Sequence, residues 1–228
     1  MAIVKVNREF SYEIVNLDED LSKWESAEAV RYFWENGASA ADYEKSFVYY
    51  HFDGAHAPLS LDKYGKPGKG ITFPRADALA GYFRVIAELF QYMKDLEIYN
   101  TSTIIITADH GFSFTRQPIL FIKRPGEKRA EMKVTHAPVD QADLYATIAE
   151  QVGLDDPAQY GETVYQIPED VLRERCRQIY NHDDSFPNPE QRNNVMYEIC
   201  YIGDNSVLKE PNETNSRVRI IEAKDALY

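Results

Sequence analysis

The sequence predicts an α/β protein with a mainly parallel sheet and a small antiparallel β subdomain after it. Thr103–Ala108, TIIITA, is rich in β-branched residues and has the length of a strand buried on both faces, which is typical of parallel sheets. A second apolar run, Ser46–Phe52, precedes it, and a long amphipathic helix lies between the two. Strand, helix and strand in this order imply parallel strands. From about Val164 we expect short alternating strands in an antiparallel arrangement, at TVYQI, RQIYNH, NVMYEICYI and RVRIIEA. We therefore place the core in residues 1–163 and the subdomain in residues 164–228.

Three segments have the periodicity of amphipathic helices. One covers Asp18–Glu35, and another covers Val139–Val152 and ends at Gly153. The clearest helix begins at Pro74, which suits a first turn because its missing N–H needs no partner there. We expect its inward face to consist of residues spaced three and four apart: Leu79, Phe83, Ile86, Phe90, Met93 and Leu96. In the last helix we expect inward positions at Ala142, Tyr145, Ile148 and Val152.

Composition and charge exclude several classes of protein. Hydrophobic residues make up 44% of the 228 residues and aromatic residues 13%, which excludes a disordered chain. The net charge of −12 argues against nucleic acid as a partner. No apolar run approaches the roughly 20 residues of a membrane span, and Met1–Ser11 lacks the apolar centre of a signal peptide.

The two cysteines, Cys176 and Cys200, both lie in the last third of the chain. They match no Cys-x-x-Cys or Cys/His spacing of a zinc site. A disulfide between neighbouring strands is one interpretation, but we expect two unpaired structural thiols.

Histidines and one aspartate follow the apolar segments, where ligands usually lie in parallel sheets. Asp109 and His110 come directly after the TIIITA strand, His56 follows the SFVYYHF run, and His136 precedes the last helix. If the two strands are parallel neighbours, His56 and His110 emerge at the same sheet edge. A carboxylate with two or three imidazoles would form a divalent-metal or phosphate-binding group. The structural alternative is that Asp109 caps a turn and each histidine only packs.

Other residues are expected to be structural. His51 lies inside the SFVYYHF run and is expected in the core or on a sheet face, whereas His182 lies in a polar turn and is expected to be exposed. The sequence has no G-x-S-x-G elbow, no P-loop and no glycine-rich dinucleotide fingerprint, so it contains no evident nucleophile.

Several blocks together resemble the alkaline phosphatase superfamily, in its sulfatase and lipoteichoic-acid-synthase-like branch. The matching blocks are HFDGAHAPL at 51–59, the helix ending in YMKDLEIYN, STIIITADHG at 102–111, PILFIKRPG, and HAPVDQADLYATIAEQVGL at 136–154. Gly161–Gln166, RCRQIYNH and MYEICYIGD resemble the small antiparallel subdomain of these enzymes. The resemblance implies a partial three-layer α/β/α core with a mainly parallel sheet.

The resemblance also implies a site and a reaction. Asp109, His110 and His136 would be ligands of a divalent metal (Mn, Zn or Ca), and His56 would be catalytic, contacting the transferred phosphate or sulfate. A metal-activated Thr, Ser or formylglycine would attack a sulfate or phosphate ester substrate. Relatives of the transferase type are membrane-anchored with the catalytic domain outside, so the resemblance implies an extracytoplasmic location.

The chain departs from the family in one respect. The family's nucleophile follows its first strand, and residues 1–17 contain no strand ending in Asp before a Thr-, Ser- or Cys-bearing helix. The C-x-P-x-R signature is absent as well, so sulfatase and phospho-transferase remain open. We therefore expect the C-terminal portion of such an enzyme, with weak metal binding and little turnover. The alternative is a truncated or degenerate non-catalytic domain that serves as a binding module and forms a homodimer through an exposed edge.

Overall fold

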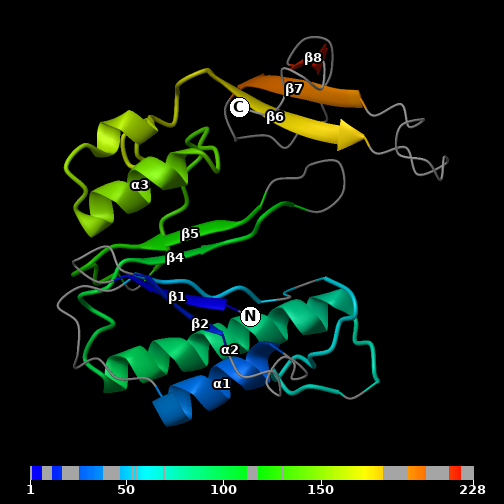
Figure 1. The fold of residues 1–228 in the computed structure, drawn as a ribbon, viewed down its shortest axis with the longest axis vertical. Helices are drawn as coiled ribbons and strands as arrows, with labels where there is room; N and C mark the ends of the chain where they lie inside the picture. Colours follow the sequence, from blue (N-terminus) through cyan, green and yellow to red (C-terminus); the bar gives the residue numbers. More distant parts are fainter. Residues whose placement is uncertain are drawn as a thin grey trace. The chain divides into compact units, whose positions relative to one another are not determined.

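The computed structural model describes residues 2–6, 12–16, 26–37, 47–52, 54, 56–68, 70–111, 118–129, 131–181, 195–203 and 216–221 (Figure 1). Together they form a mixed α/β protein, as the sequence predicts. The chain divides into a first unit of Met1–Ile104 and Ile122–Lys128 and a second unit of Ile105–Phe121 and Arg129–Tyr228. The boundary that we predict between residues 163 and 164 stays a prediction.

The first unit contains a small antiparallel sheet and two helices. Strands β1 (Ala2–Val6), β2 (Tyr12–Asn16) and β3 (Phe47–Val48) pair in the order β2-β1-β3. Helix α1 (Ser26–Gly37) contributes to a core with α2 (Arg75–Asp95). Its buried residues are Ala27, Trp34, Leu61, Tyr82 and Val85. The predicted helix at 18–35 is confirmed from residue 26 onward, and residues 18–25 lie outside the described residues.

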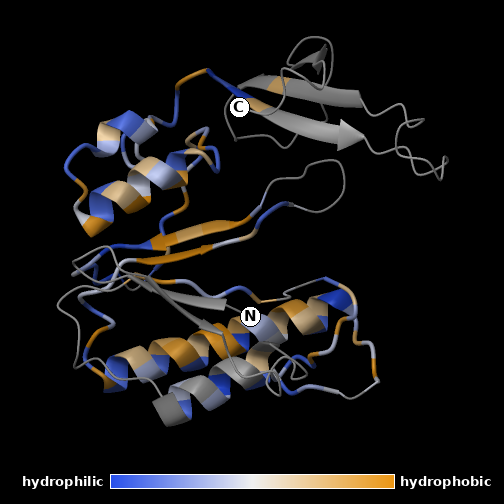
Figure 2. Cartoon of the chain, viewed as in Figure 1, coloured by the Kyte–Doolittle hydropathy of each residue, from blue (hydrophilic) through white to orange (hydrophobic). Residues whose placement is uncertain are grey.

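Helix α2 begins directly after Pro74, as predicted, but its buried face is not the predicted one. Hydrophobic residues lie along the whole helix (Figure 2). Of the six predicted inward residues, Leu79 and Phe83 are exposed, and the other four, Ile86, Phe90, Met93 and Leu96, are half-buried. The buried positions are Ala78, Gly81, Tyr82 and Val85. The buried face is the one that carries small residues. A Cβ at Gly81 would lie 2.2 Å from the carbonyl oxygen of Asp62, so only glycine allows this contact. The backbone at Asp62 therefore approaches the helix on the side where the side chain is missing.

Strands β4 (Ile104–Thr107) and β5 (Leu120–Lys123) form a two-stranded sheet. The pairing is antiparallel, since Thr107 donates from Oγ1 to the Ile119 carbonyl at 2.9 Å while Gly126 N–H donates to the Asn100 carbonyl at 2.6 Å. The three β4 isoleucines are half-buried rather than buried on both faces. In the described part of the chain, β3 pairs with β1 and β4 with β5. The three-layer parallel core therefore stays a prediction.

The second unit combines helix α3 (Asp143–Val152), the short 3-10 helix η2 (Pro157–Tyr160) and a three-stranded sheet. Gly153 ends α3 in the left-handed conformation, with φ 79°, as the sequence predicts. The helix begins later than predicted, and its inward face is again different. Tyr145 and Val152 are exposed, whereas the buried positions are Asp143, Ala146, Thr147 and Ala149.

The sheet of the second unit consists of β6 (Arg173–Asn181), β7 (Val195–Gly203) and β8 (Ser216–Ile221), and all of its pairs are antiparallel. This agrees with the antiparallel strands predicted at RQIYNH, NVMYEICYI and RVRIIEA. The expected strand at TVYQI is wrong, because residues 164–166 form a turn in which the Gln166 N–H donates to the Thr163 carbonyl at 2.9 Å.

The prediction of two unpaired thiols is also wrong. Cys176 and Cys200 lie directly opposite each other on β6 and β7 and form a disulfide, with their Cα atoms 4.0 Å apart. The two cysteines are 24 residues apart, which matches no known disulfide motif. The pairing could not be read from the sequence, because it depends on the register of the two strands.

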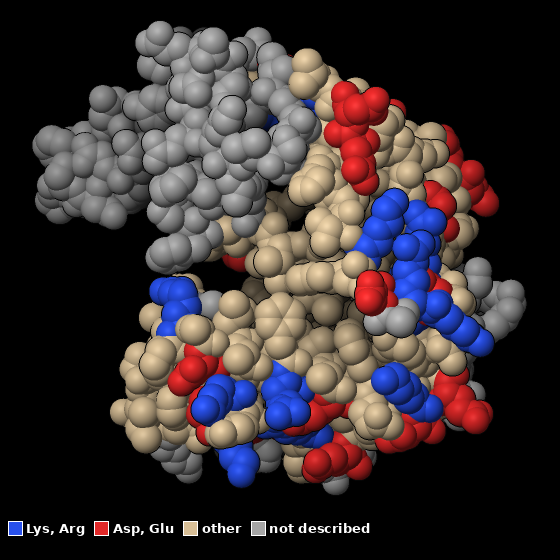
Figure 3. Space-filling model, turned by 180° about the vertical axis from the view of Figure 1, so that it is seen from behind, with Lys and Arg blue, Asp and Glu red and all other residues tan. Residues whose placement is uncertain are grey.

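The surface charge and the hydropathy of the helices bear on whether the chain has a charged binding face or a membrane span. Acidic and basic side chains lie near one another on the described part of the face in Figure 3. Among the described helices, none is long and apolar enough to cross a membrane.

Candidate metal centre

Asp109 and His110 occupy an exposed turn directly after β4, as predicted. The His110 backbone N–H donates to Oδ1 of Asp109 at 2.9 Å, which leaves Oδ2 directed elsewhere. Oδ2 lies 3.6 Å from Nε2 of His110, and the two side chains are 73% and 72% exposed. The turn-capping contact of Oδ1 therefore would not prevent Oδ2 from acting as a ligand, since each role uses a different oxygen.

The second ring nitrogen of His110 is also engaged. Nδ1 lies 2.8 Å from the Gly111 carbonyl oxygen, and because a carbonyl only accepts, Nδ1 is the donor in this contact. In the neutral ring Nε2 then carries the lone pair. Metal-ligating histidines are commonly oriented by such a contact from their other nitrogen. Two ligand atoms, Nε2 and the Asp109 Oδ2, thus lie close together at the protein surface.

Gln141 connects this turn to the loop before α3. Its Nε2 donates to the carbonyls of Ala108 and Asp109, at 2.7 and 2.8 Å. Both protons of one amide are used on consecutive backbone carbonyls, which fixes the turn at two points. The same loop carries His136, whose ring is exposed five residues earlier. The structure therefore brings the HAPVDQ loop against the Asp109 turn.

A buried ion pair holds that loop on the second unit. The Asp143 side chain is 3% exposed and accepts two hydrogen bonds from the Arg173 guanidinium, at 2.5 and 2.7 Å. Asp143 also accepts the Asp140 backbone N–H at 2.7 Å, and Arg173 donates to the Pro138 carbonyl at 3.4 Å. The hydrogen bond with Asp143 raises the pKa of Arg173 above its ordinary value. Both ends of the loop between Ala137 and Gln141 are thereby anchored.

His56 belongs to the first unit. It is exposed, and its Nδ1 lies 2.6 Å from the Ala57 carbonyl oxygen, so that Nε2 again carries the lone pair in the neutral ring. Its approach to Asp109 stays a prediction. The expectation that His51 lies in the core or on a sheet face is wrong, because β3 ends at Val48 and His51 is exposed. His182 lies outside the described residues.

Three residues that build this region were not predicted from the sequence: Gln141, Asp143 and Arg173. Asp143 begins a helix and thus resembles any acidic first-turn residue. Arg173 is 30 residues away from its partner, and Gln141 acts only through backbone atoms 32 and 33 residues away. Only the polar run between Val139 and Leu144 hinted that this loop faces something other than an apolar core.

The donor set suits a divalent ion. One carboxylate oxygen and imidazole nitrogens are ligands that Zn²⁺ and Mn²⁺ accept, and a catalytic site needs three protein ligands with an open position. Asp109, His110 and His136 would supply three, but in the structure their ligand atoms do not all lie within 4.8 Å of one another; among the described residues, only Glu174, Cys176 and Cys200 form such a group. Comparisons of the chain with protein-family models, with curated proteins and with solved structures found no match.

Proposed function

We propose that the chain is the C-terminal part of a metal-dependent, sulfatase-like hydrolase or transferase that acts on sulfate or phosphate esters. Asp109, His110 and His136 would hold the divalent ion, and His56 would contact the transferred group. The observation that supports this most is the double hydrogen bond from Gln141 to the Ala108 and Asp109 carbonyls. A turn that served only to reverse the chain would not need its backbone fixed from a distant loop.

Each side chain has a separate task in this proposal. Asp109 supplies a charged oxygen, while His110 and His136 supply neutral nitrogens, so the ligand set leaves part of the ion's charge uncompensated for an anionic ester. A bound ion would polarise the ester oxygen and stabilise charge that develops on it. His56 would donate a hydrogen bond to the same anion in its protonated form. The family resemblance attributes the nucleophile to the segment that follows the family's first strand.

Metal binding tests the proposal independently of turnover. We would titrate the oxidised protein with Mn²⁺ and Zn²⁺ by calorimetry and compare it with Asp109→Ala, His110→Ala and His136→Ala. We expect one ion per chain in the wild type and loss of binding in the Asp109 and His110 variants. His51→Ala is the matched control, because His51 is an exposed histidine outside the proposed ligand set. Unchanged affinity in the Asp109→Ala, His110→Ala double variant would overturn the proposal.

Gln141→Ala sharpens the same test. Gln141 would support the ligands without touching the ion, and loss of such a partner weakens metal affinity by about 10–100-fold. Gln159→Ala is its control, because Gln159 also donates its amide to a backbone carbonyl, that of Asp156 at 2.9 Å. Equal affinity in both glutamine variants would mean that the Gln141 contact does not serve the metal site.

A further inference from the structure

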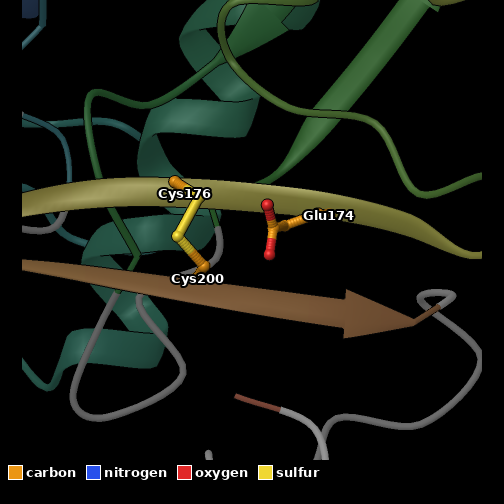
Figure 4. A group of neighbouring side chains, drawn as sticks. All are labelled: Glu174, Cys176 and Cys200. Atoms are coloured by element: carbon orange, nitrogen blue, oxygen red, sulfur yellow. A yellow bond between two sulfur atoms is a disulfide. The ribbon is translucent and has the colours of Figure 1, made fainter. Parts of the chain in front are cut away.

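A second group of ligand atoms lies on the sheet of the second unit, apart from the Asp109 turn. The Glu174 carboxylate lies beside the Cys176–Cys200 disulfide (Figure 4). One ligand atom from each of the three residues lies within 4.8 Å of the others. Cys176 pairs with Cys200 across the two strands, and Glu174 precedes Cys176 by two residues on β6. All three side chains therefore point to one face, because side chains alternate along a strand.

The disulfide is accessible to a reductant from one side. Cys176 and Glu174 are exposed, whereas Cys200 is only 1% exposed. A dithiol reductant would attack the Cys176 sulfur as a thiolate, form a mixed disulfide and release the Cys200 thiolate. The second thiol of the reductant would then displace Cys176. The reductant becomes a cyclic disulfide, and the protein gains two electrons and two protons as two thiols.

We propose that the reduced Cys176 and Cys200 thiolates, together with the Glu174 carboxylate, form a redox-gated site for a Zn²⁺-type cation. Two thiolates and one carboxylate are ligands that Zn²⁺ binds, and Cd²⁺ shares the preference for sulfur. Binding would release the two thiol protons. Three protein ligands leave the fourth tetrahedral position to water.

Gating follows from the chemistry of the sulfurs. In the disulfide neither sulfur carries the charge of a thiolate, which is the form that binds metal. Oxidation therefore closes the site, and reduction opens it. In both states β6 and β7 remain cross-linked, covalently in the first state and through the ion in the second. The proposal needs no contribution from Asp109 or His110, so it holds or fails separately from the proposed function.

Cd²⁺ is the probe of choice because thiolate-to-cadmium charge transfer absorbs in the ultraviolet and reports sulfur ligation directly. The full chain carrying Asp109→Ala and His110→Ala is reduced with a phosphine under anaerobic conditions and titrated with Cd²⁺. We expect one equivalent to produce the charge-transfer band in the reduced protein and no band in the oxidised protein. Zn²⁺ added afterwards should displace Cd²⁺ and remove the band. Absence of the band in reduced protein that retains its circular dichroism spectrum would overturn the proposal.

Glu174→Gln isolates the carboxylate without disturbing the sulfurs. Because Glu174 is exposed, this variant is expected to fold and to form its disulfide. We expect the band to remain while the affinity falls at least tenfold, because loss of even a group that only orients a ligand costs about 10–100-fold. Glu169→Gln, another exposed glutamate of the second unit, is the control and should match the wild type. Equal affinity in both variants would remove Glu174 from the site, and with it the site as proposed.

Discussion

The interactions that stabilise the first unit internally differ in kind from those that stabilise the second unit. In the first unit, buried apolar and aromatic side chains from α1, α2 and the intervening loop meet in one cluster. An ion pair among its described residues, Arg31 with Glu88 at 2.6 Å, lies near the surface with Glu88 42% exposed, so water screens it. In the second unit, the buried Asp143 and the Cys176–Cys200 disulfide connect elements that are distant in sequence.

This difference matters for the placement of ligand atoms. Apolar packing is non-directional and tolerates small shifts of the side chains that take part. Hydrogen bonds and ion pairs depend on angle as well as distance, so they fix particular backbone atoms. Gln141, Asp143 and Arg173 fix the backbone of the Asp109 turn and of the loop that carries His136. The candidate metal centre thus lies in the unit whose interactions are directional.

Asp143→Asn should destabilise the second unit and leave the stability of the first unit unchanged. The substitution keeps the size of the side chain but leaves the Arg173 guanidinium without its carboxylate. Removing one partner of a buried pair typically costs 3–5 kcal/mol, and Arg173 is 28% exposed, so we expect a loss of about 3 kcal/mol. Hydrogen exchange should show faster opening of the amides in α3 and unchanged rates in α2.

Two variants control this experiment. Asp155→Asn removes an exposed carboxylate from the same unit and should change stability by less than about 0.5 kcal/mol. Asp143→Asn combined with Arg173→Met removes the stranded charge and should recover part of the loss. If α2 and α3 amides accelerated equally in Asp143→Asn, the two units would not differ in the way described above.

Gly81→Ala should destabilise the first unit, because the added methyl group would clash with neighbouring atoms. In an exposed helix interior, alanine is better than glycine by about 0.5–1 kcal/mol. At position 81 the added Cβ would lie 2.2 Å from the Asp62 carbonyl oxygen and 3.2 Å from the Leu61 Cβ, so the loop or the helix must shift. We expect a net destabilisation of about 1–3 kcal/mol in urea unfolding.

The matched control reverses the substitution one position earlier. Ala80 is exposed on the same helix, and Ala80→Gly should cost about 1 kcal/mol from helix propensity. Alanine is then preferred at position 80 and glycine at position 81. A stabilised Gly81→Ala protein would show that the close approach of Asp62 is not a constraint in solution.

The sequence predicted the positions of elements better than their orientation. Pro74 and Gly153 act locally through backbone geometry, so they correctly marked the start of α2 and the end of α3. The fully buried positions differ from the predicted ones because large apolar residues such as Phe83 and Tyr145 were expected to be inside, and both are exposed. The structure instead buries faces that contain Gly81 and Ala146, where small residues allow another segment to approach closely.

The same limit applies to the candidate metal centre. Asp109 and His110 were evident because they follow a strand directly, and the structure places their ligand atoms 3.6 Å apart. Gln141, Arg173 and the Cys176–Cys200 pair were not evident, since each acts across 24 residues or more. Such contacts depend on strand register and on how loops are anchored, so the identity of a single residue does not predict its partner.

Tyr50 places a polar hydroxyl beside the apolar cluster of the first unit, and its ionisation should weaken that unit slightly. Its hydroxyl oxygen accepts the Trp34 indole N–H at 3.1 Å, and the two rings meet edge to face at 5.9 Å. Burial raises the pKa of Tyr50 above its ordinary value of 10.0, against the opposing effect of the Trp34 hydrogen bond. A raised pKa means that folding favours the neutral phenol. This contribution is complete below pH 10.0 and is lost as the pH rises from 10.0 through the folded value.

Tyr50→Phe removes this contribution and keeps the aromatic ring. At neutral pH we expect a loss of about 1 kcal/mol, because the Trp34 N–H loses its acceptor. Above pH 10.0, urea unfolding should show a shallower decline of stability with pH in the variant than in the wild type. Tyr160→Phe, at an exposed tyrosine of the second unit, should reproduce the wild-type decline. Parallel curves of stability against pH for the wild type and Tyr50→Phe would contradict this prediction. They would show that the Tyr50 hydroxyl titrates in the same way in the folded and the unfolded protein.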